Sequence, residues 1–143
     1  MTGSGAGRPA RPATDQWTDV PGMMIPAEVG KGTPSYGALF VATFTAEILA
    51  KKDDWGGITQ FDILFGGQPG HPQSDNHRTF AAMPGEWRSV TVVRAFHFDD
   101  DVVRRDATVK VQVKRQNGVD FGIQNFLLKV ERYPVTTGGD TVL

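Results

Sequence analysis

The segment Ala107–Lys114 constrains the fold of this chain more than any other, because its residues alternate strictly between apolar and polar. The apolar members are Ala107, Val109, Val111 and Val113, and the polar members are Thr108, Lys110, Gln112 and Lys114. A period of two is that of a β-strand, whose successive side chains point to opposite faces of a sheet. An apolar face opposite a polar one is typical of an antiparallel sheet with one face in solvent.

Other segments carry strand patterns of the same kind. Strands are predicted at Ala38–Ile48, Ile58–Phe65, His77–Met83, Trp87–Phe98 and Val119–Tyr133. In the first of these, Phe40, Ala42, Phe44, Ala46 and Ile48 share one face. Arg94 interrupts an otherwise apolar row in Trp87–Phe98. The segment from Gly66 to Asn76 is rich in glycine and proline and is predicted to be a long loop.

The last predicted strand contains two apolar phases. Phe126, Leu128 and Val130 mark one face, whereas Phe121 and Ile123 fall on the opposite phase. A β-bulge between Gly122 and Asn125 would reconcile them, because a bulge inserts one extra residue and shifts the alternation. The preceding Asn117-Gly118 favours a tight hairpin turn.

These patterns predict an all-β fold. No helix of useful length and no βαβ pattern is visible, which disfavours nucleotide-binding folds built on parallel sheets. About eight strands separated by turn signals are typical of an antiparallel two-sheet sandwich, or jelly roll.

Prolines divide the chain into three expected parts. Residues 1–34 hold five of the nine prolines and are expected to form an extended, Gly/Pro-rich arm with at most short edge strands. Residues 35–134 are expected to form the sandwich, and residues 135–143 a flexible tail.

Composition excludes several classes of function. The formal net charge is -1, which gives no field for nucleic acid. The absence of cysteine excludes disulfides and thiolate zinc sites. The longest apolar segment, Leu39–Ala50, is interrupted by polar residues and is too short to span a membrane. Without a secretory signal at its start, the chain is expected to be cytoplasmic at synthesis.

Candidate catalytic and metal-binding groups do not form a recognisable site. His71, His77 and His97 match no common zinc spacing. The acidic turn Asp99–Asp106 could collect a hard cation, but it lacks the spacing of a known calcium loop and contains Arg104 and Arg105. Ser74, Asp75 and His77 crowd one loop without the rigid frame of a catalytic triad. We therefore expect no enzymatic activity, no metal and no cofactor.

Four residues are candidates for partner binding. Arg8, Arg11 and Trp17 lie on the predicted arm, and Trp55 lies in a turn with two aspartates and two glycines. A tryptophan in such a turn suits a protein contact or the apolar face of a sugar ring.

The segments Trp87–Val92, Ala107–Val113 and Phe126–Val130 resemble the second half of small jelly-roll modules. These modules include complement-type and tumour-necrosis-factor-like domains and virion appendage proteins of bacterial viruses. The resemblance implies a compact sandwich that often forms trimers and acts by binding or by reinforcing an assembly.

Two functions from different classes follow. The leading hypothesis is a non-catalytic structural protein, such as a decoration or minor structural protein of a phage-like particle, attached through its N-terminal arm. Its expected partner is protein: further copies of itself, as in a trimer, or a capsid or tail lattice. The alternative is a carbohydrate-binding module that uses Trp55 and the loop 66–77.

Overall fold

The computed structural model describes residues 2–5, 16–30, 38–50, 58–83, 85–98, 105–116 and 121–134. Most of them are in strands, and the one helix among them, α1, is a single turn. The elements are β1 (Thr2–Gly5), β2 (Thr18–Ile25), β3 (Glu28–Val29), β4 (Ala38–Ala50), β5 (Ile58–Phe65), β6 (Gln68–Pro69), α1 (Asp75–Arg78), β7 (Thr79–Ala81), β8 (Arg88–Phe98), β9 (Arg105–Asp106), β10 (Val109–Gln116) and β11 (Phe121–Pro134). No helix in these ranges is long and apolar enough to cross a membrane.

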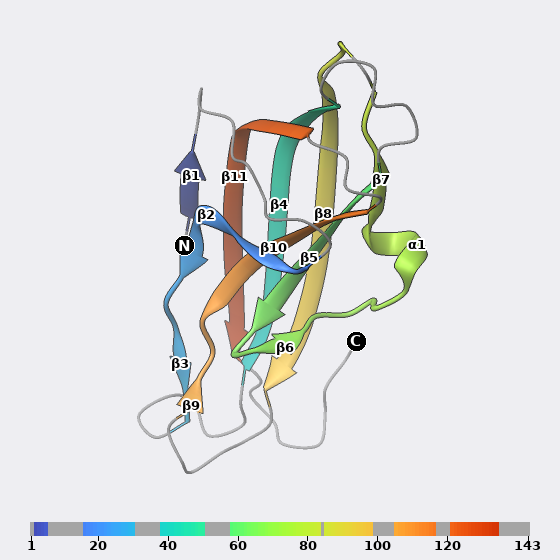
Figure 1. The fold of residues 1–143 in the computed structure, drawn as a ribbon. Helices are drawn as coiled ribbons and strands as arrows, with labels where there is room; N and C mark the ends of the chain where they lie inside the picture. The colour runs from blue at the N-terminus through green and yellow to red at the C-terminus, as the bar shows by residue number, and fades with distance from the viewer. Residues whose placement is uncertain are drawn as a thin grey trace.

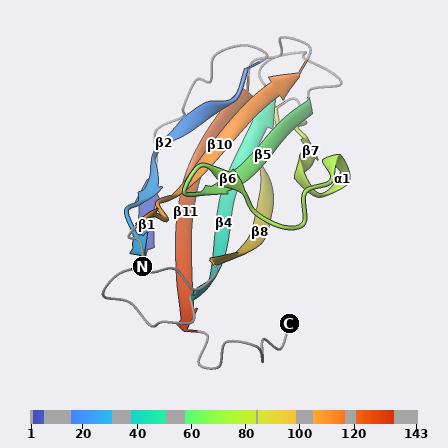
Figure 2. The same cartoon turned by 90° about the horizontal axis from the view of Figure 1, so that it is seen from below.

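The strands form two main sheets that face each other (Figures 1 and 2). The first sheet has the order β1-β11-β4-β8, and the second has the order β2-β10-β5-β6, with β7 also paired to β5. Every pairing is antiparallel, and β3 and β9 form a separate short ladder.

The pairings are nested along the chain. β1 pairs with β11, β2 with β10, β4 with β8, and β5 with β6 and β7. This connectivity folds one long antiparallel ribbon over itself, and the members of each pair occupy the same sheet. It is the connectivity of a jelly roll, which confirms the predicted fold class.

The core lies between the two sheets and is rich in phenylalanine. Phe40, Phe44, Phe61 and Phe65 are fully buried, and the rings of Phe44 and Phe61 meet across the sheets at 5.3 Å between centroids. Every even-numbered residue of β4 is buried, as the alternation in Ala38–Ile48 predicts. The apolar face predicted for Ala107–Lys114 is likewise buried.

The predicted bulge in the last strand is present. The register of β11 against β4 shifts between Gln124 and Leu127, and Asn125 has a φ of 48°. The Asn125 side chain donates a hydrogen bond to a carboxylate oxygen of Glu47 on β4. Because of this shift, Ile123 and Phe126 both face the core although they are three residues apart.

The expectation that the sandwich begins near residue 35 needs correction. β2 and β3 lie within the predicted arm, yet Val20, Met23, Ile25 and Val29 are buried in the core. Pro21 and Gly22 fall where the β2–β10 register shifts, and Gly22 has a φ of 79°. The edge position of β2 and this bulge accommodate the proline without loss of the strand. The tail 135–143 lies outside the described residues.

The strand predicted at His77–Met83 is present in a shorter form as β7, whereas the loop predicted for residues 66–76 contains β6 and the first residues of α1. This part of the chain leaves β5 of the second sheet, reaches the edge of the first sheet at His71, and returns to β5 as β7. His71 exchanges two backbone hydrogen bonds with Ala95 on β8, at 2.8 and 3.0 Å. α1 lies on the β8 side of the molecule (Figures 1 and 2).

The arginine that interrupts the apolar row of β8 holds this segment in place. Arg94 is only 4% exposed. Its Nη2 donates to the carbonyl oxygen of His77 in α1 at 2.6 Å, and its Nη1 donates to the carbonyl oxygen of Val93 at 2.8 Å. A buried guanidinium requires such acceptors, so the polar break in the sequence has a structural role.

Candidate functional site

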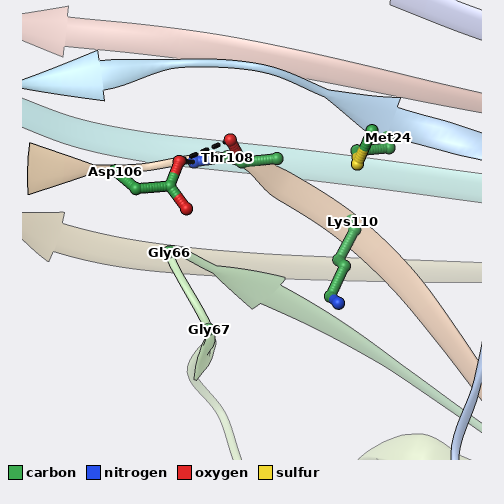
Figure 3. A pocket seen from close by; sticks show the side chains of 6 residues that line it. All are labelled: Met24, Gly66, Gly67, Asp106, Thr108 and Lys110. Atoms are coloured by element: carbon green, nitrogen blue, oxygen red, sulfur yellow. Dashed lines mark hydrogen bonds between the residues drawn. The ribbon is translucent and has the colours of Figure 1, made fainter.

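A pocket of about 350 Å³ lies on the second sheet, where β2, β10 and the turn after β5 meet (Figure 3). Its lining comes from three segments that are distant in the sequence: Met24, Gly66 with Gly67, and Asp106 with Thr108 and Lys110. The nested pairing of β2 with β10 and of β10 with β5 brings these segments together.

One wall of the pocket is a two-residue turn. Gly66 and Gly67 connect β5 to β6 with φ values of 57° and 85°. Positive φ at both central residues is typical of the tight two-residue hairpin turn, and glycine adopts it without strain. The Gly66 N–H donates to the carbonyl oxygen of Thr108 at 2.8 Å. A Cβ at Gly66 would overlap the carbonyl oxygen of Asp106, so only glycine permits this close approach.

The carboxylate of Asp106 is fixed by its own neighbours. Its Oδ1 accepts hydrogen bonds from the Thr108 backbone N–H, at 2.9 Å, and from the Thr108 hydroxyl. The pKa of the Asp106 carboxyl lies below its ordinary value, mainly because of the hydroxyl hydrogen bond and next because of the backbone hydrogen bond. The Lys110 ammonium lowers this pKa further. In Figure 3 the second carboxylate oxygen points away from Thr108, on the side of Gly66.

The ammonium of Lys110 forms an ion pair with a carboxylate on the neighbouring strand β2. Its Nζ lies 3.4 Å from Oδ1 of Asp19 on β2, and the same Oδ1 accepts from Nε2 of Gln112 at 2.9 Å. The Gln112 hydrogen bond, followed by Lys110, holds the pKa of the Asp19 carboxyl below its ordinary value. Met24, directly opposite Lys110 in the β2–β10 ladder, is 56% exposed and supplies an apolar surface.

These groups offer three kinds of contact within one small pocket. Asp106 accepts hydrogen bonds, Lys110 donates them, and the Thr108 hydroxyl can do both. The Met24 thioether adds a polarisable apolar contact. The arrangement suits a small ligand that has several hydroxyl groups and an apolar face.

Replacing Thr108 with valine is expected to raise the pKa of the Asp106 carboxyl toward its ordinary value of about 3.9. The hydroxyl hydrogen bond, the largest cause of the lowering, would be lost. Because the folded-state pKa is lowered, the Asp106 carboxylate stabilises the fold above about pH 4 and loses this effect as the pH falls through the folded pKa. An NMR titration of the carboxyl carbon measures the change. Thr43→Val, on the other sheet, should leave the pKa unchanged, and an unaltered pKa in Thr108→Val would contradict the assignment.

Of the four binding residues predicted from the sequence, the described residues include only Trp17. Trp17 is half-buried and directly precedes β2. Arg8, Arg11 and Trp55 lie outside the described residues. Of the loop 66–77, only Gly66 and Gly67 reach the pocket.

The three histidines lie in different surroundings. The His71 ring stacks on Phe96, with 6.2 Å between centroids, whereas His77 accepts the Arg94 hydrogen bond through its carbonyl oxygen and His97 lies in β8. In the described part of the chain, no group of three or more His, Cys, Asp or Glu side chains could hold a metal. Of the acidic turn, Asp99–Asp101 lies outside that part, and Asp106 is held by Thr108.

Sequence reasoning missed Met24, Thr108 and Lys110 as site residues. Thr108 and Lys110 look like ordinary solvent-facing residues of an alternating strand, and Met24 was assigned to the arm. The paired glycines directly after a strand were the available signal, because they mark a tight turn where the backbone can come close to another segment.

No family model and no curated protein sequence matches this chain. Its fold is similar to several solved structures. These include dimeric latent PorU from Porphyromonas gingivalis, with a TM-score of 0.47 and 13% identity over 92% of this chain and 11% of that one. They also include the CBM22-1 xylan-binding domain from Paenibacillus barcinonensis Xyn10C, with a TM-score of 0.43 and 10% identity over 91% of this chain and 92% of that one.

A third similar structure is the EclA C-terminal domain, a sugar-binding protein, with a TM-score of 0.37 and 15% identity over 84% of this chain and 80% of that one. Identities this low do not assign the chain to the family of any of the three. None of them is described as a virion, complement-type or tumour-necrosis-factor-like protein, so that part of the resemblance stays a prediction.

Proposed function

We propose that the protein is a non-catalytic carbohydrate-binding module whose ligand occupies the pocket between β2, β10 and the Gly66–Gly67 turn. The observation that carries the proposal is the pairing of a fixed carboxylate, Asp106, with an anchored ammonium, Lys110, in one pocket. Each sugar hydroxyl can donate to the carboxylate and accept from the ammonium. The Met24 side chain would pack against the apolar C–H face of the ring.

The size of the pocket supports a ligand of one or two sugar rings. Its volume of about 350 Å³ is near the lower end of the range typical of small-molecule sites. Trp55, the stacking residue predicted from the sequence, stays a prediction for this ligand.

The carboxyl groups near the pocket favour binding over hydrolysis. Most glycoside hydrolases need two carboxyl groups, one of which must remain protonated to act as a general acid. A raised pKa serves that purpose. Here the pKa values of Asp106 and Asp19 are both lowered, so neither carboxyl group suits proton donation.

Lys110→Met and Asp106→Asn are each expected to weaken sugar binding about tenfold or more, because hydrogen bonds to charged groups contribute about 1.5–3 kcal/mol. Glycan arrays would identify the ligand, and calorimetry would measure its affinity for each variant. Lys129→Met, which removes an exposed lysine from the first sheet, is the matched control and should bind like the unsubstituted protein.

Two outcomes would contradict the proposal. One is the absence of binding across a broad panel of neutral and acidic sugars. The other is a sugar whose affinity is unchanged in both pocket variants.

A further inference from the structure

The first sheet has an open edge at β8. Ala95 directs its N–H and C=O away from β4, toward His71. Because these directions alternate along an antiparallel strand, Ser89, Thr91 and Val93 direct theirs the same way. Within the described ranges, no other backbone pairs with this edge at Ser89, Thr91 or Val93. The Val93 carbonyl oxygen accepts from Arg94 and can accept a second bond.

This edge lacks the features that usually prevent strand pairing between molecules. Proteins protect sheet edges with prolines, bulges, charges or very short strands. In the second sheet, β2 carries Pro21 in a bulge, and β6 has two residues, one of them Pro69. The segment Ser89–Val93 reads Ser-Val-Thr-Val-Val, without charge, proline or glycine, and its β-branched residues favour strands.

We propose that Ser89–Val93 pairs antiparallel with the same segment of a second copy of this chain, about a two-fold axis at Thr91. Thr91 then lies opposite its own counterpart, and Ser89 lies opposite Val93. The five paired residues are uncharged, and the axis sets the segment against itself, as a two-fold interface requires. In this register Arg88 lies opposite Arg94, whose guanidinium is buried and bonded to the carbonyl oxygen of His77. The two first sheets become one continuous sheet.

The backbone permits few other registers. A shift by one residue sets the outward N–H and C=O groups of one copy against inward groups of the other. A shift that moves the axis toward Phe98 requires Ala95, which already bonds to His71. The axis at Thr91 uses all three outward-directed residues of the open segment.

Light scattering of the full chain across about 10–200 µM tests the proposal and should give twice the chain mass at the upper end. Thr91→Lys sets two ammonium groups opposite each other across the axis and should give a monomer, as should Thr91→Glu. An equimolar mixture of the two variants should restore the dimer, because each lysine then faces a glutamate. The Thr91 side chain is exposed, so both variants should keep the melting temperature of the unsubstituted monomer within a few degrees.

Leu127→Lys is the matched control. Leu127 is 39% exposed on the same sheet face and lies in the same row as Thr91, because Thr45 pairs with both, but it is two strands away from the edge. This variant should remain a dimer. A monomeric unsubstituted chain, a trimer, or dissociation of Leu127→Lys to the same extent as Thr91→Lys would overturn edge pairing.

Discussion

Replacing Phe44 with alanine should lower the free energy of unfolding by about 3–5 kcal/mol, because the substitution leaves a cavity in a close-packed core. Phe44 is fully buried on the middle of the first sheet, and its ring packs against Phe61 of the second sheet. Few neighbours can fill the space, since the facing residues belong to two sheets fixed by their own ladders. Urea denaturation followed by tryptophan fluorescence measures the change, which corresponds to a fall in melting temperature of about 10–17 °C.

Val93→Ala is the control for this substitution. Val93 is 48% exposed on the adjacent strand β8, so its truncation should cost less than about 1 kcal/mol. An equal loss of stability in the two variants would contradict the assignment of the core to the space between the sheets.

Replacing Gly66 with alanine should lower the free energy of unfolding by about 2–5 kcal/mol and remove the sugar binding that we propose for the pocket. The new Cβ meets two penalties at once. A positive φ is unfavourable for alanine by about 1–2 kcal/mol. The overlap with the Asp106 carbonyl oxygen forces the chain between β9 and β10 to move, at a further cost of about 1–3 kcal/mol.

Gly67→Ala separates these two penalties. Gly67 also has a positive φ, but a Cβ there meets nothing within 4 Å. Its substitution should therefore cost only the conformational part, about 1–2 kcal/mol, and leave the pocket intact. The same denaturation measurement applies to both variants, and equal losses would show that the close approach at Gly66 is unimportant.

The sequence predicts the strands whose alternation is unbroken. β4 and β10 appear where period-two patterns are clear, and even the bulge in β11 follows from the phase change between Ile123 and Phe126. These features are local, since they depend on which face of one strand is apolar. The buried Arg94 was visible as a break in the pattern, but its acceptor in α1 was not.

Two kinds of feature could not be predicted in this way. The pattern in β2 predicts an arm and not a strand, because Pro21 and Gly22 interrupt its alternation at the point where a bulge accommodates them. The pocket was missed because its lining depends on which strands become neighbours. Met24, Gly66 and Lys110 are ordinary residues until the nested pairing places them side by side.

That nested pairing has a consequence for how the chain acquires its structure. Thr2 lies opposite Lys129, and β4 occupies its sheet between β8 and β11, both of which come later in the sequence. Pairings between such remote residues carry a large loop-closure cost, so folding should take milliseconds to seconds rather than microseconds. On the ribosome, the apolar face of β4 would stay exposed to solvent until β8 and β11 had been synthesised. This exposure makes the nascent chain prone to aggregation and favours assistance by chaperones.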